Sequence, residues 1–304
     1  MADRRYTINA FTVKLEVPPS ISANPLDTTP SDREIERDVM DLLGFFEKFD
    51  VHATFFTSDA ITSRIPRLIR TISDAGHEAA ILSPRFLSPL DQLLRFREEI
   101  ATAKSRLEDA LGDEVIGCRL TPITSGWRSP AMIETLVQEG FLYSSSTFPK
   151  QSIRPLLLSG TGKAHRLQTP SGTLWELPLT SWRPFGIGMP SIRAAGGPSL
   201  SVNPAWVVAR GVEGMNRHGE PAILYIHSWG LSTVDPDYGS LPLRERLLRY
   251  GPREEIIGKL TRIFRSYRFG SIQEAFASRL ITESSRPSNP RRTSIVRLNP
   301  DASE

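Results

Sequence analysis

The sequence predicts an α/β protein in which parallel strands alternate with helices, built either as a closed barrel or as an open, doubly wound sheet. Short apolar segments alternate with longer segments whose apolar residues recur at helical spacing, which is typical of parallel strands joined by helical crossovers. About seven such strands fit into roughly 275 residues. No GxGxxG turn follows the first strand and no Walker sequence occurs, so a nucleotide-binding Rossmann fold loses its main support.

The first expected strand, residues 8–17, carries two charges within an apolar run. Side chains alternate along a strand, so Lys14 and Glu16 share one face and the apolar residues share the other: Val13, Leu15 and Val17. Charged groups inside a fold must be paired or must line a polar cleft, because unpaired buried charge is costly. The carboxyl end of this strand is therefore a candidate site, and an ordinary solvated strand end is the plain alternative.

The remaining elements follow from the same patterns. A helix begins at Ser31, where Ser-Asp-Arg-Glu matches a capping box. Further strands are expected at residues 51–56, 78–82, 115–120, 141–145 and 222–227, and further helices at 61–75, 87–111, 130–139, 204–217 and 254–267. A β-insertion is expected around 173–178, and a short strand and helix at 269–276 close the fold.

We expect one folded domain over 1–282 and a disordered tail over 283–304, where Ser, Pro, Arg and Asn leave too little apolar surface to pack.

Composition limits the classes of function. The net charge of +3 comes from arginines spread along the chain without a basic block, which argues against nucleic-acid binding. The single cysteine, Cys118, excludes an internal disulfide framework and a cysteine-based zinc site. No stretch approaches the roughly 20 apolar residues that cross a bilayer, and residues 1–6 are too short and polar for a secretory signal. We therefore expect a cytoplasmic protein without a membrane span.

Eight segments, in order, resemble the successive motifs of the polysaccharide deacetylases, a carbohydrate esterase family: NAFTVKLEV, HATFF, DAGHEAAI, GCRLTP, EGFLYSSSTFP, LWELPLTSW, ILYIHSWGL and YRFGSIQEAF. They resemble most closely the cytoplasmic subgroup associated with exopolysaccharide and exosortase loci. The resemblance implies an irregular (β/α)7-type barrel of about seven strands. It also implies metal-assisted amide hydrolysis, in which a carboxylate and two histidines hold a divalent metal, an Asp acts as base and a His protonates the leaving amine.

Several matching positions depart from that family's site. Lys14 stands where the base Asp is expected, and Glu16 alone remains of the acidic residues that follow it. Leu82 and Phe86 stand at the two histidine positions. A catalytic zinc-like ion needs about three N, O or S ligands, and these two side chains offer none. We expect no metal and no other cofactor, and we expect His77 to pack at the turn before its strand rather than to act as a ligand.

Other matching positions retain the family's residues or supply groups for a sugar. The resemblance implies that Arg119 matches the arginine that orients the base and that His227 matches the acid histidine. Ser144 replaces an Asp, and we expect it to face the interior and contact the substrate. Indole faces stack on sugar rings, and three tryptophans fall in loops that are expected to follow strands: Trp127, Trp182 and Trp229. The plain alternative is that each tryptophan is a hydrophobic plug beneath a loop.

Whether the protein is an enzyme stays open at this point, and the first hypothesis is a pseudoenzyme. In it the barrel binds a carbohydrate, an acidic sugar or a partner protein in polysaccharide metabolism, because Lys14 and Arg119 would make the floor of the pocket cationic. In the plain alternative, an ion pair between Lys14 and Glu16 only fills the space that the metal left.

Two further hypotheses keep the enzyme active. The second is a metal-independent hydrolase of carbon–nitrogen bonds other than peptide bonds, which uses four residues: His227, Glu16, Arg119 and Lys14. The third is a conventional metal-dependent deacetylase that recruits Asp235 or Asp237 as a replacement ligand. Hydrolysis of N-acetylated oligosaccharides and metal analysis distinguish the three.

Overall fold

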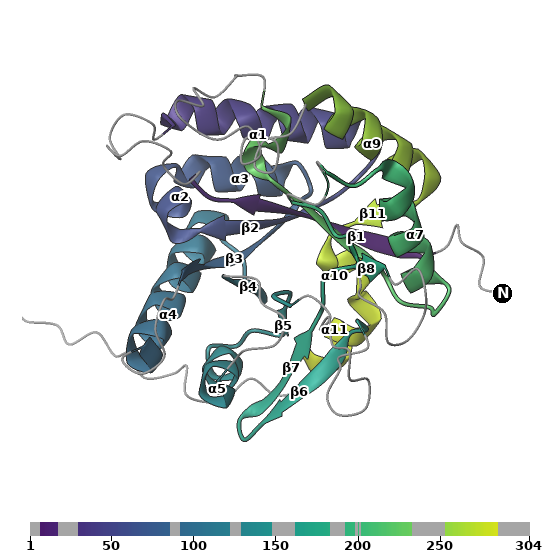
Figure 1. Cartoon of the computed structure of the whole chain (residues 1–304). Coiled ribbons are helices and arrows are strands. Elements are labelled where there is room, and N and C mark those ends of the chain that lie inside the picture. The colour runs from purple at the N-terminus through teal and green to yellow at the C-terminus, as the bar shows by residue number, and fades with distance from the viewer. Residues whose placement is uncertain are drawn as a thin grey trace, which may run out of the picture.

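The computed structural model describes residues 7–17, 30–85, 92–121, 129–147, 162–182, 192–197, 200, 202–232 and 253–284. Within these ranges, parallel strands stand side by side in the following order: β10 (Ile223–His227), β1 (Ile8–Leu15), β2 (Thr54–Ser58), β3 (Glu78–Arg85), β4 (Gly117–Thr121), β5 (Tyr143–Ser144) and β7 (Gly172–Glu176). Helices surround them, as Figure 1 shows. The fold is the α/β barrel of (β/α)7 type that we expected.

The outer helices are α1 (Asp32–Glu47), α2 (Asp59–Arg64), α3 (Pro66–Asp74), α4 (Gln92–Leu111), α5 (Pro130–Gln138), α7 (Ala205–Asn216) and α9 (Arg253–Ser266). The capping box predicted at Ser31 is confirmed, since its hydroxyl accepts a hydrogen bond from the Glu34 amide while the Glu34 carboxylate accepts one from the Ser31 amide. Among the described residues, no helix combines the length and the apolarity that crossing a membrane requires.

The alternation predicted for β1 divides its side chains between two environments. The strands form the wall of the barrel, and a core lies between this wall and the helices. Three residues of β1 are fully buried in that core: Phe11, Val13 and Leu15. The centroid of the Phe11 ring lies 5.5 Å from that of Phe46 and 5.0 Å from that of Phe264. The opposite face of β1 looks into the barrel and carries Ala10, Thr12 and Lys14. Each buried phenylalanine contributes about 2 kcal/mol or more to folding, so the outer core holds β1 in the register that turns Lys14 inward.

The barrel closes between β7 and β10 through irregular backbone rather than through a direct strand ladder. After β7, the Thr180 amide donates to the Ile223 carbonyl at 3.1 Å. The Tyr225 amide then donates to the Ala195 carbonyl at 2.6 Å, and the Gly197 amide donates to the Tyr225 carbonyl at 2.9 Å. We call the segments 177–180 and 194–197 the seam, and their hydrogen bonds make the sheet a closed barrel rather than an open sheet.

The structure corrects two sequence assignments. The helix expected at 61–75 is two helices, α2 and α3, because Pro66 has no amide to continue the first helix and instead begins the second. The segment around 173–178 is not an insertion, because β7 belongs to the wall and pairs in parallel with β5. Its hairpin partner is β6 (His165–Thr169), which is antiparallel to it at the edge of the sheet.

The short strand and helix expected at 269–276 are confirmed and close the amino end of the barrel, the end where β2 and β3 begin. β11 (Arg268–Gly270) pairs in parallel with the start of β1, and α10 (Ile272–Ala275) and α11 (Ala277–Ser284) follow it. Phe276 and Leu280 are buried in the same cluster as the inward-facing residues of the wall. α11 extends to Ser284, two residues past the expected domain boundary, and residues 285–304, the rest of the tail expected to be disordered, lie outside the described residues.

Candidate functional site

Three charged or titratable side chains meet where β1 and β10 end, an end of the barrel that we call the mouth and define by residues 14–16 and 227–229. The Lys14 ammonium lies 2.8 Å from Oε1 of Glu16, so the ion pair of the plain alternative is present. Nδ1 of His227 lies 3.4 Å from the same oxygen, which is long for a hydrogen bond but close for a charge contact. The wall brings the three together because Lys14 and His227 are register partners of β1 and β10.

The neighbours of these groups set their protonation. Burial opposes the charge of Glu16, but the contact with His227 and the positive charge of Lys14 outweigh it and hold the pKa of this carboxyl at about 2. Burial lowers the pKa of the His227 imidazole, the Glu16 carboxylate opposes that effect, and the charge of Lys14 adds to it. At neutral pH the mouth therefore holds an ionised carboxylate beside a neutral imidazole.

Arg119 places a second cation deeper in the barrel, fully removed from solvent. Its guanidinium donates to the Ser145 carbonyl at 2.7 Å, to the Ser145 hydroxyl at 3.0 Å and to the Thr12 hydroxyl at 3.0 Å. It also lies 4.0 Å above the Phe56 ring. Within the described part of the chain none of its hydrogen bonds reaches a carboxylate, and burial lowers its pKa to about 10. The guanidinium is therefore a buried cation held by neutral groups.

The structure changes which serine lines the interior. Ser144 is completely buried, and its hydroxyl shares a hydrogen bond of 2.7 Å with that of Ser146. Tyr143 and Ser145 point into the barrel, so the residue between them belongs to the outer face of the wall. Ser145, which the sequence analysis missed, thus holds the interior position predicted for Ser144. The run Tyr-Ser-Ser-Ser has no alternation of apolar and polar residues that would identify which serine faces inward. Thr12 could have been predicted, because it lies two residues before Lys14 and therefore on the same face of β1.

The donors present at the mouth do not fit the divalent metal that the resemblance implies. Glu16 already contacts the Lys14 ammonium, and Leu82 is buried in the interior cluster without a donor atom. Among the described residues no group of three or more His, Cys, Asp or Glu side chains could hold a metal ion. The other positions considered from sequence lie outside the described residues: Phe86, Asp235 and Asp237.

The three tryptophans do not gather at one place. Trp229 lies in the mouth on the 3₁₀ helix η1 (Ser228–Leu231), and its ring stacks on His227 with centroids 4.5 Å apart and planes 22° apart. Its buried Nε1 has no hydrogen-bond acceptor among the described residues. Trp182, on β8 (Ser181–Trp182), lies beside α7 and packs against Trp206. Trp127 lies outside the described residues.

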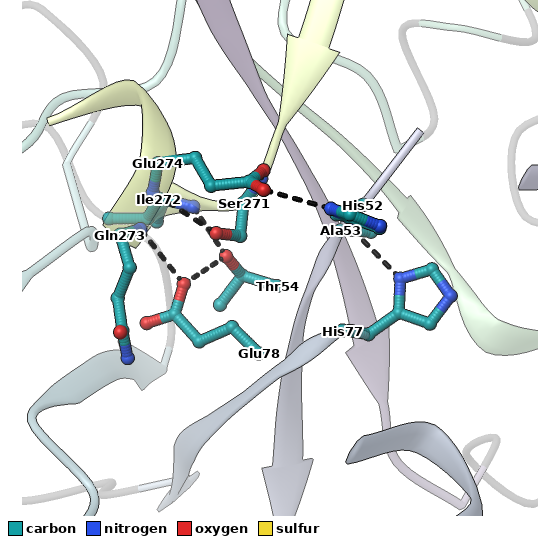
Figure 2. A network of polar contacts seen from close by, with 9 residues as sticks. All are labelled: His52, Ala53, Thr54, His77, Glu78, Ser271, Ile272, Gln273 and Glu274. Atoms are coloured by element: carbon teal, nitrogen blue, oxygen red, sulfur yellow. Dashed lines mark hydrogen bonds and ion pairs between the residues drawn. The ribbon is translucent and has the colours of Figure 1, made fainter. Parts of the chain in front are cut away.

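Two other histidines, His77 and His52, belong to the amino end. Figure 2 shows His77 beneath the start of β2, where its Nδ1 accepts a hydrogen bond from the Ala53 amide at 2.9 Å, and burial lowers its pKa to about 4. His77 thus packs at the turn before its strand, as predicted. His52 contacts the Glu274 carboxylate of α10 at 2.8 Å.

Glu78 is a buried carboxyl that joins three elements at the amino end. It accepts hydrogen bonds from the Thr54 hydroxyl at 2.6 Å and the Gln273 amide at 3.1 Å, which Figure 2 shows. It also accepts one from the Tyr143 hydroxyl at 2.6 Å. Burial raises its pKa, and the three donors partly offset that effect. The network ties α10 to the wall, so its role is structural and it is separate from the mouth.

Comparison with solved structures decides the fold. A protein of Mycobacterium smegmatis assigned as a polysaccharide deacetylase matches with a TM-score of 0.58 and 20% identity over 97% of each chain. The fold is that of a polysaccharide deacetylase. The PuuE allantoinase matches this polysaccharide deacetylase fold with a TM-score of 0.56 and 15% identity over 95% of this chain and 94% of its own. The 4-α-glucanotransferase of Thermococcus litoralis matches with a TM-score of 0.53 and 13% identity over 89% of this chain and 40% of its own.

Comparisons at the level of sequence are less informative. A family described as a domain of unknown function, DUF3473, matches residues 145–277, which is less than half of the chain. That range contains β7, the seam and β10, including His227. No curated protein sequence matches the chain. The deacetylase fold therefore stands on the structural likeness, and the chemistry must be argued from the residues.

Proposed function

We propose that this protein is a pseudoenzyme with the polysaccharide deacetylase fold, which binds a carbohydrate without metal-dependent hydrolysis. The observation that carries the proposal is the Lys14 ammonium 2.8 Å from Glu16, at the position where the resemblance expects a carboxylate base beside a metal. The resemblance also supports membership in the cytoplasmic exopolysaccharide and exosortase subgroup, where the protein would serve polysaccharide metabolism together with a protein partner.

The charge arrangement explains why a metal is not expected at the mouth. An ion bound to Glu16 would share its carboxylate with an ammonium, and two unit charges 4 Å apart repel by about 4 kcal/mol at the effective dielectric of a protein surface. The imidazoles that would offset this cost are replaced by Leu82 and Phe86. The ammonium thus takes over the role of counter-charge to Glu16.

The same charges favour an acidic sugar as ligand. Lys14 and Arg119 contribute two positive charges to the interior, and Glu16 contributes one negative charge at the mouth. A carboxylate or a carbonyl oxygen on the sugar would complement the cations, and the stacked rings of Trp229 and His227 offer an apolar surface to the sugar ring. The side chains of Glu16 and His227 keep 23% and 18% of their surface exposed, so a ligand can reach them.

A second candidate function, a metal-independent hydrolase of carbon–nitrogen bonds, is favoured by the contact between Glu16 and His227. A carboxylate that orients a neutral imidazole is the arrangement of a general base, which would take a proton from an attacking water. The resemblance implies that this histidine is an acid, but the lowered pKa of His227 favours a base. Lys14 and Arg119 would then stabilise the negative charge that develops on the amide oxygen.

Metal analysis and assays of the full chain test the proposal. Protein purified without chelator should hold no stoichiometric zinc, cobalt or nickel after dialysis, and it should not hydrolyse N-acetylated oligosaccharides with or without these metals. It should bind acidic oligosaccharides in calorimetric titrations, and His227→Ala should weaken that binding. A stoichiometric metal that is lost in Glu16→Ala would overturn the proposal, and hydrolysis without metal that His227→Ala abolishes would establish the second candidate.

A triple variant tests the physical reason that we propose for the loss of the metal site. Lys14→Asp combined with Leu82→His and Phe86→His supplies three donors, so we expect metal binding to return more readily than deacetylation. Turnover requires the attacking water within about 3 Å of both base and carbonyl, and a misplacement of about 1 Å can cost a hundredfold in rate. Full activity of the variant would show that the surrounding groups are unaltered, and a folded variant without metal binding would contradict our alignment of 82 and 86.

A further inference from the structure

Two tyrosines of the wall point into the barrel, but their hydroxyl groups differ in what they contact. The Tyr143 hydroxyl donates a hydrogen bond of 2.6 Å to Glu78 at the amino end. The Tyr225 hydroxyl, on β10, makes no hydrogen bond to any described residue, and it is not one of the unpaired atoms that are sealed from solvent in the described structure. It is therefore accessible, and Tyr225 keeps 6% of its surface exposed. The interior thus offers a ligand a hydroxyl that the described protein does not use.

Tyr225 lies one layer below the mouth. Side chains two positions apart on a strand share a face, so Tyr225 points inward beneath His227, and the centroids of their rings are 5.9 Å apart. Its register partner on β1 is Thr12, just as Lys14 is the partner of His227. Thr12 in turn accepts a hydrogen bond from the Arg119 guanidinium at 3.0 Å. We call Thr12, Arg119 and Tyr225 the lower layer, which lies about 7 Å further into the barrel than Lys14 and His227.

The lower layer carries a positive charge that no contact neutralises within the described part of the chain. Cζ of Arg119 lies 5.6 Å from the centroid of the Tyr225 ring. The hydrogen bonds of this guanidinium go to neutral oxygens. The Glu176 carboxylate acts on it through its charge but makes no hydrogen bond to it. An anion that enters the mouth is therefore attracted toward the Tyr225 hydroxyl, which stands between the mouth and the buried cation.

The protonation of the phenol makes it a donor. Burial raises the pKa of the Tyr225 phenol above its ordinary value, the charges of Arg119 and Arg193 oppose that effect, and the charge of Glu16 adds to it. The phenol is therefore neutral at pH 7 and can donate its proton in a hydrogen bond. A carboxylate accepts such a bond and also compensates the buried guanidinium. A neutral sugar hydroxyl accepts the bond but leaves the cation uncompensated.

The seam fixes the position of this hydroxyl. Gly197 has a φ of 58°, and a Cβ on it would lie 2.2 Å from the Tyr225 hydroxyl oxygen and 2.5 Å from the Cζ atom of the ring. A side chain at position 197 would displace the phenol, so glycine allows the ring to rest against the backbone of the seam. A phenylalanine would fill the same space. The hydroxyl is thus held in place without contributing a hydrogen bond to the described fold.

We propose that Tyr225 is a specificity-determining residue of the mouth, whose hydroxyl donates a hydrogen bond to the carboxylate of an acidic sugar. The buried Arg119 guanidinium stabilises this carboxylate from beneath through its charge, while the sugar ring stays at the level of His227 and Trp229. The inference rests on the proposed carbohydrate-binding function. It adds where the acidic group lies and which residue distinguishes an acidic sugar from a neutral one.

Calorimetric titration of the full chain with oligogalacturonate and oligomannuronate, each also as its neutral methyl ester, tests the inference. We expect at least one acid to bind, and its ester to bind about tenfold more weakly. Tyr225→Phe should weaken binding of the acid about tenfold and leave binding of the ester unchanged. Tyr267→Phe is the matched control, because it removes a hydroxyl that lies 3.3 Å from Glu213 on the helix side of the wall. It should bind the acid like the wild type.

Thermal denaturation separates a role in binding from a role in folding. Tyr225→Phe should keep its melting temperature within about 2 °C of the wild type, because no described residue hydrogen-bonds the hydroxyl. Tyr143→Phe should lower it by several degrees, because it takes a donor from the buried Glu78 carboxyl. A comparable fall in both variants would overturn the inference, since the Tyr225 hydroxyl would then be structural.

NMR of protein with ¹³C at Cζ of its six tyrosines locates the carboxylate. The signal that is lost in Tyr225→Phe should shift when the acidic oligosaccharide is added, and also with acetate, which supplies a carboxylate without a sugar. The signal that is lost in Tyr267→Phe should stay in place.

The remaining outcomes separate this inference from the proposed function. Equal binding of the acid by Tyr225→Phe and Tyr267→Phe, or equal binding of acid and ester by the wild type, would overturn the inference and leave the carbohydrate-binding mouth in place. If no oligosaccharide binds but acetate shifts the Tyr225 signal, the carboxylate position stands and the proposed carbohydrate-binding function falls. Absence of all binding and of any shift would overturn both.

Discussion

Glu16 keeps its negative charge at the mouth of the barrel because two neighbours favour that charge. The Lys14 ammonium at 2.8 Å and the His227 ring at 3.4 Å together stabilise the carboxylate more than burial destabilises it. The same carboxylate keeps Lys14 from being an uncompensated buried cation. The three residues therefore form one electrostatic unit, and a change at any one of them should be measurable at the other two.

The first prediction concerns stability against pH. The folded-state pKa of Glu16, about 2, lies below its ordinary value of 4.5. Its stabilising contribution is therefore complete above pH 4.5 and is lost as the pH falls toward 2. We expect Glu16→Gln to lower the free energy of unfolding at pH 7 by about 2 kcal/mol and to flatten its fall below pH 4.5, as urea denaturation would measure. Glu99→Gln, on the exposed face of α4, should change neither quantity.

The second prediction uses His227 as a reporter of its neighbours. The charge of Lys14 lowers the pKa of this imidazole and the Glu16 carboxylate raises it. Lys14→Met should therefore raise the pKa of His227, and Glu16→Gln should lower it further, in NMR titrations of the ring protons. Shifts of the same sign in both variants, or no shift in either, would show that the three groups do not form one unit.

At the scale of elements, the seam is where this barrel departs from a regular ladder. The segment 194–197 replaces a strand beside β10, and Gly196 has a φ of 128°, which disfavours residues with a side chain. A Cβ there would lie 1.8 Å from the Tyr225 carbonyl oxygen. The close approach of this backbone to Tyr225 thus depends on a glycine, and Tyr225 in turn lies between the Arg119 guanidinium and the His227 ring.

The third prediction is that Gly196→Ala opens or strains the seam. We expect a loss of about 3 kcal/mol or more in the free energy of unfolding, because the backbone must move to admit the methyl group. The matched control is Gly214→Ala on α7, where a Cβ meets no atom within 4 Å and should stabilise the helix by up to about 1 kcal/mol. Equal stability of the two variants in thermal denaturation would mean that the seam tolerates a shift.

At the scale of the whole molecule, the barrel has a closed amino end and a mouth that carries the candidate site. The amino end is closed by β11, α10 and α11, which Glu78 ties to the wall through Thr54 and Gln273. The mouth carries the charged side chains and the aromatic stack. This division matches the general behaviour of barrels of parallel strands, whose sites lie at the carboxyl ends.

The fourth prediction separates the tail from the domain. Deletion of residues 285–304 should leave the melting temperature nearly unchanged, because this segment lacks an apolar face. Deletion of residues 277–304 should lower it by several degrees or more, because it also removes Leu280, which is 4% exposed within the interior cluster. A large loss from the shorter deletion would mean that the tail docks on the barrel or on a partner.

A good part of the candidate site could be predicted from the sequence. The period of two along β1 placed Lys14 and Glu16 on one face, and the motif order pointed to His227 and Arg119 as their neighbours. The sequence could not show that Ser145 rather than Ser144 faces inward, since β5 is too short to reveal its phase. It also could not show that Trp182 lies beside α7, away from Trp229, because the position of Trp182 depends on the path that the backbone takes after the seam segment 177–180.

The sequence by itself determined the alternation of strands and helices, the capped start of α1 and the charges at the end of β1, because each depends on residues a few positions apart. Only the tertiary structure decided that β7 belongs to the wall, that the seam closes the barrel and that the hydrogen bonds of Arg119 go to neutral groups. Those features depend on contacts between residues separated by tens to hundreds of positions. Local periodicity carries no information about such pairs, and the packing of the whole chain selects them.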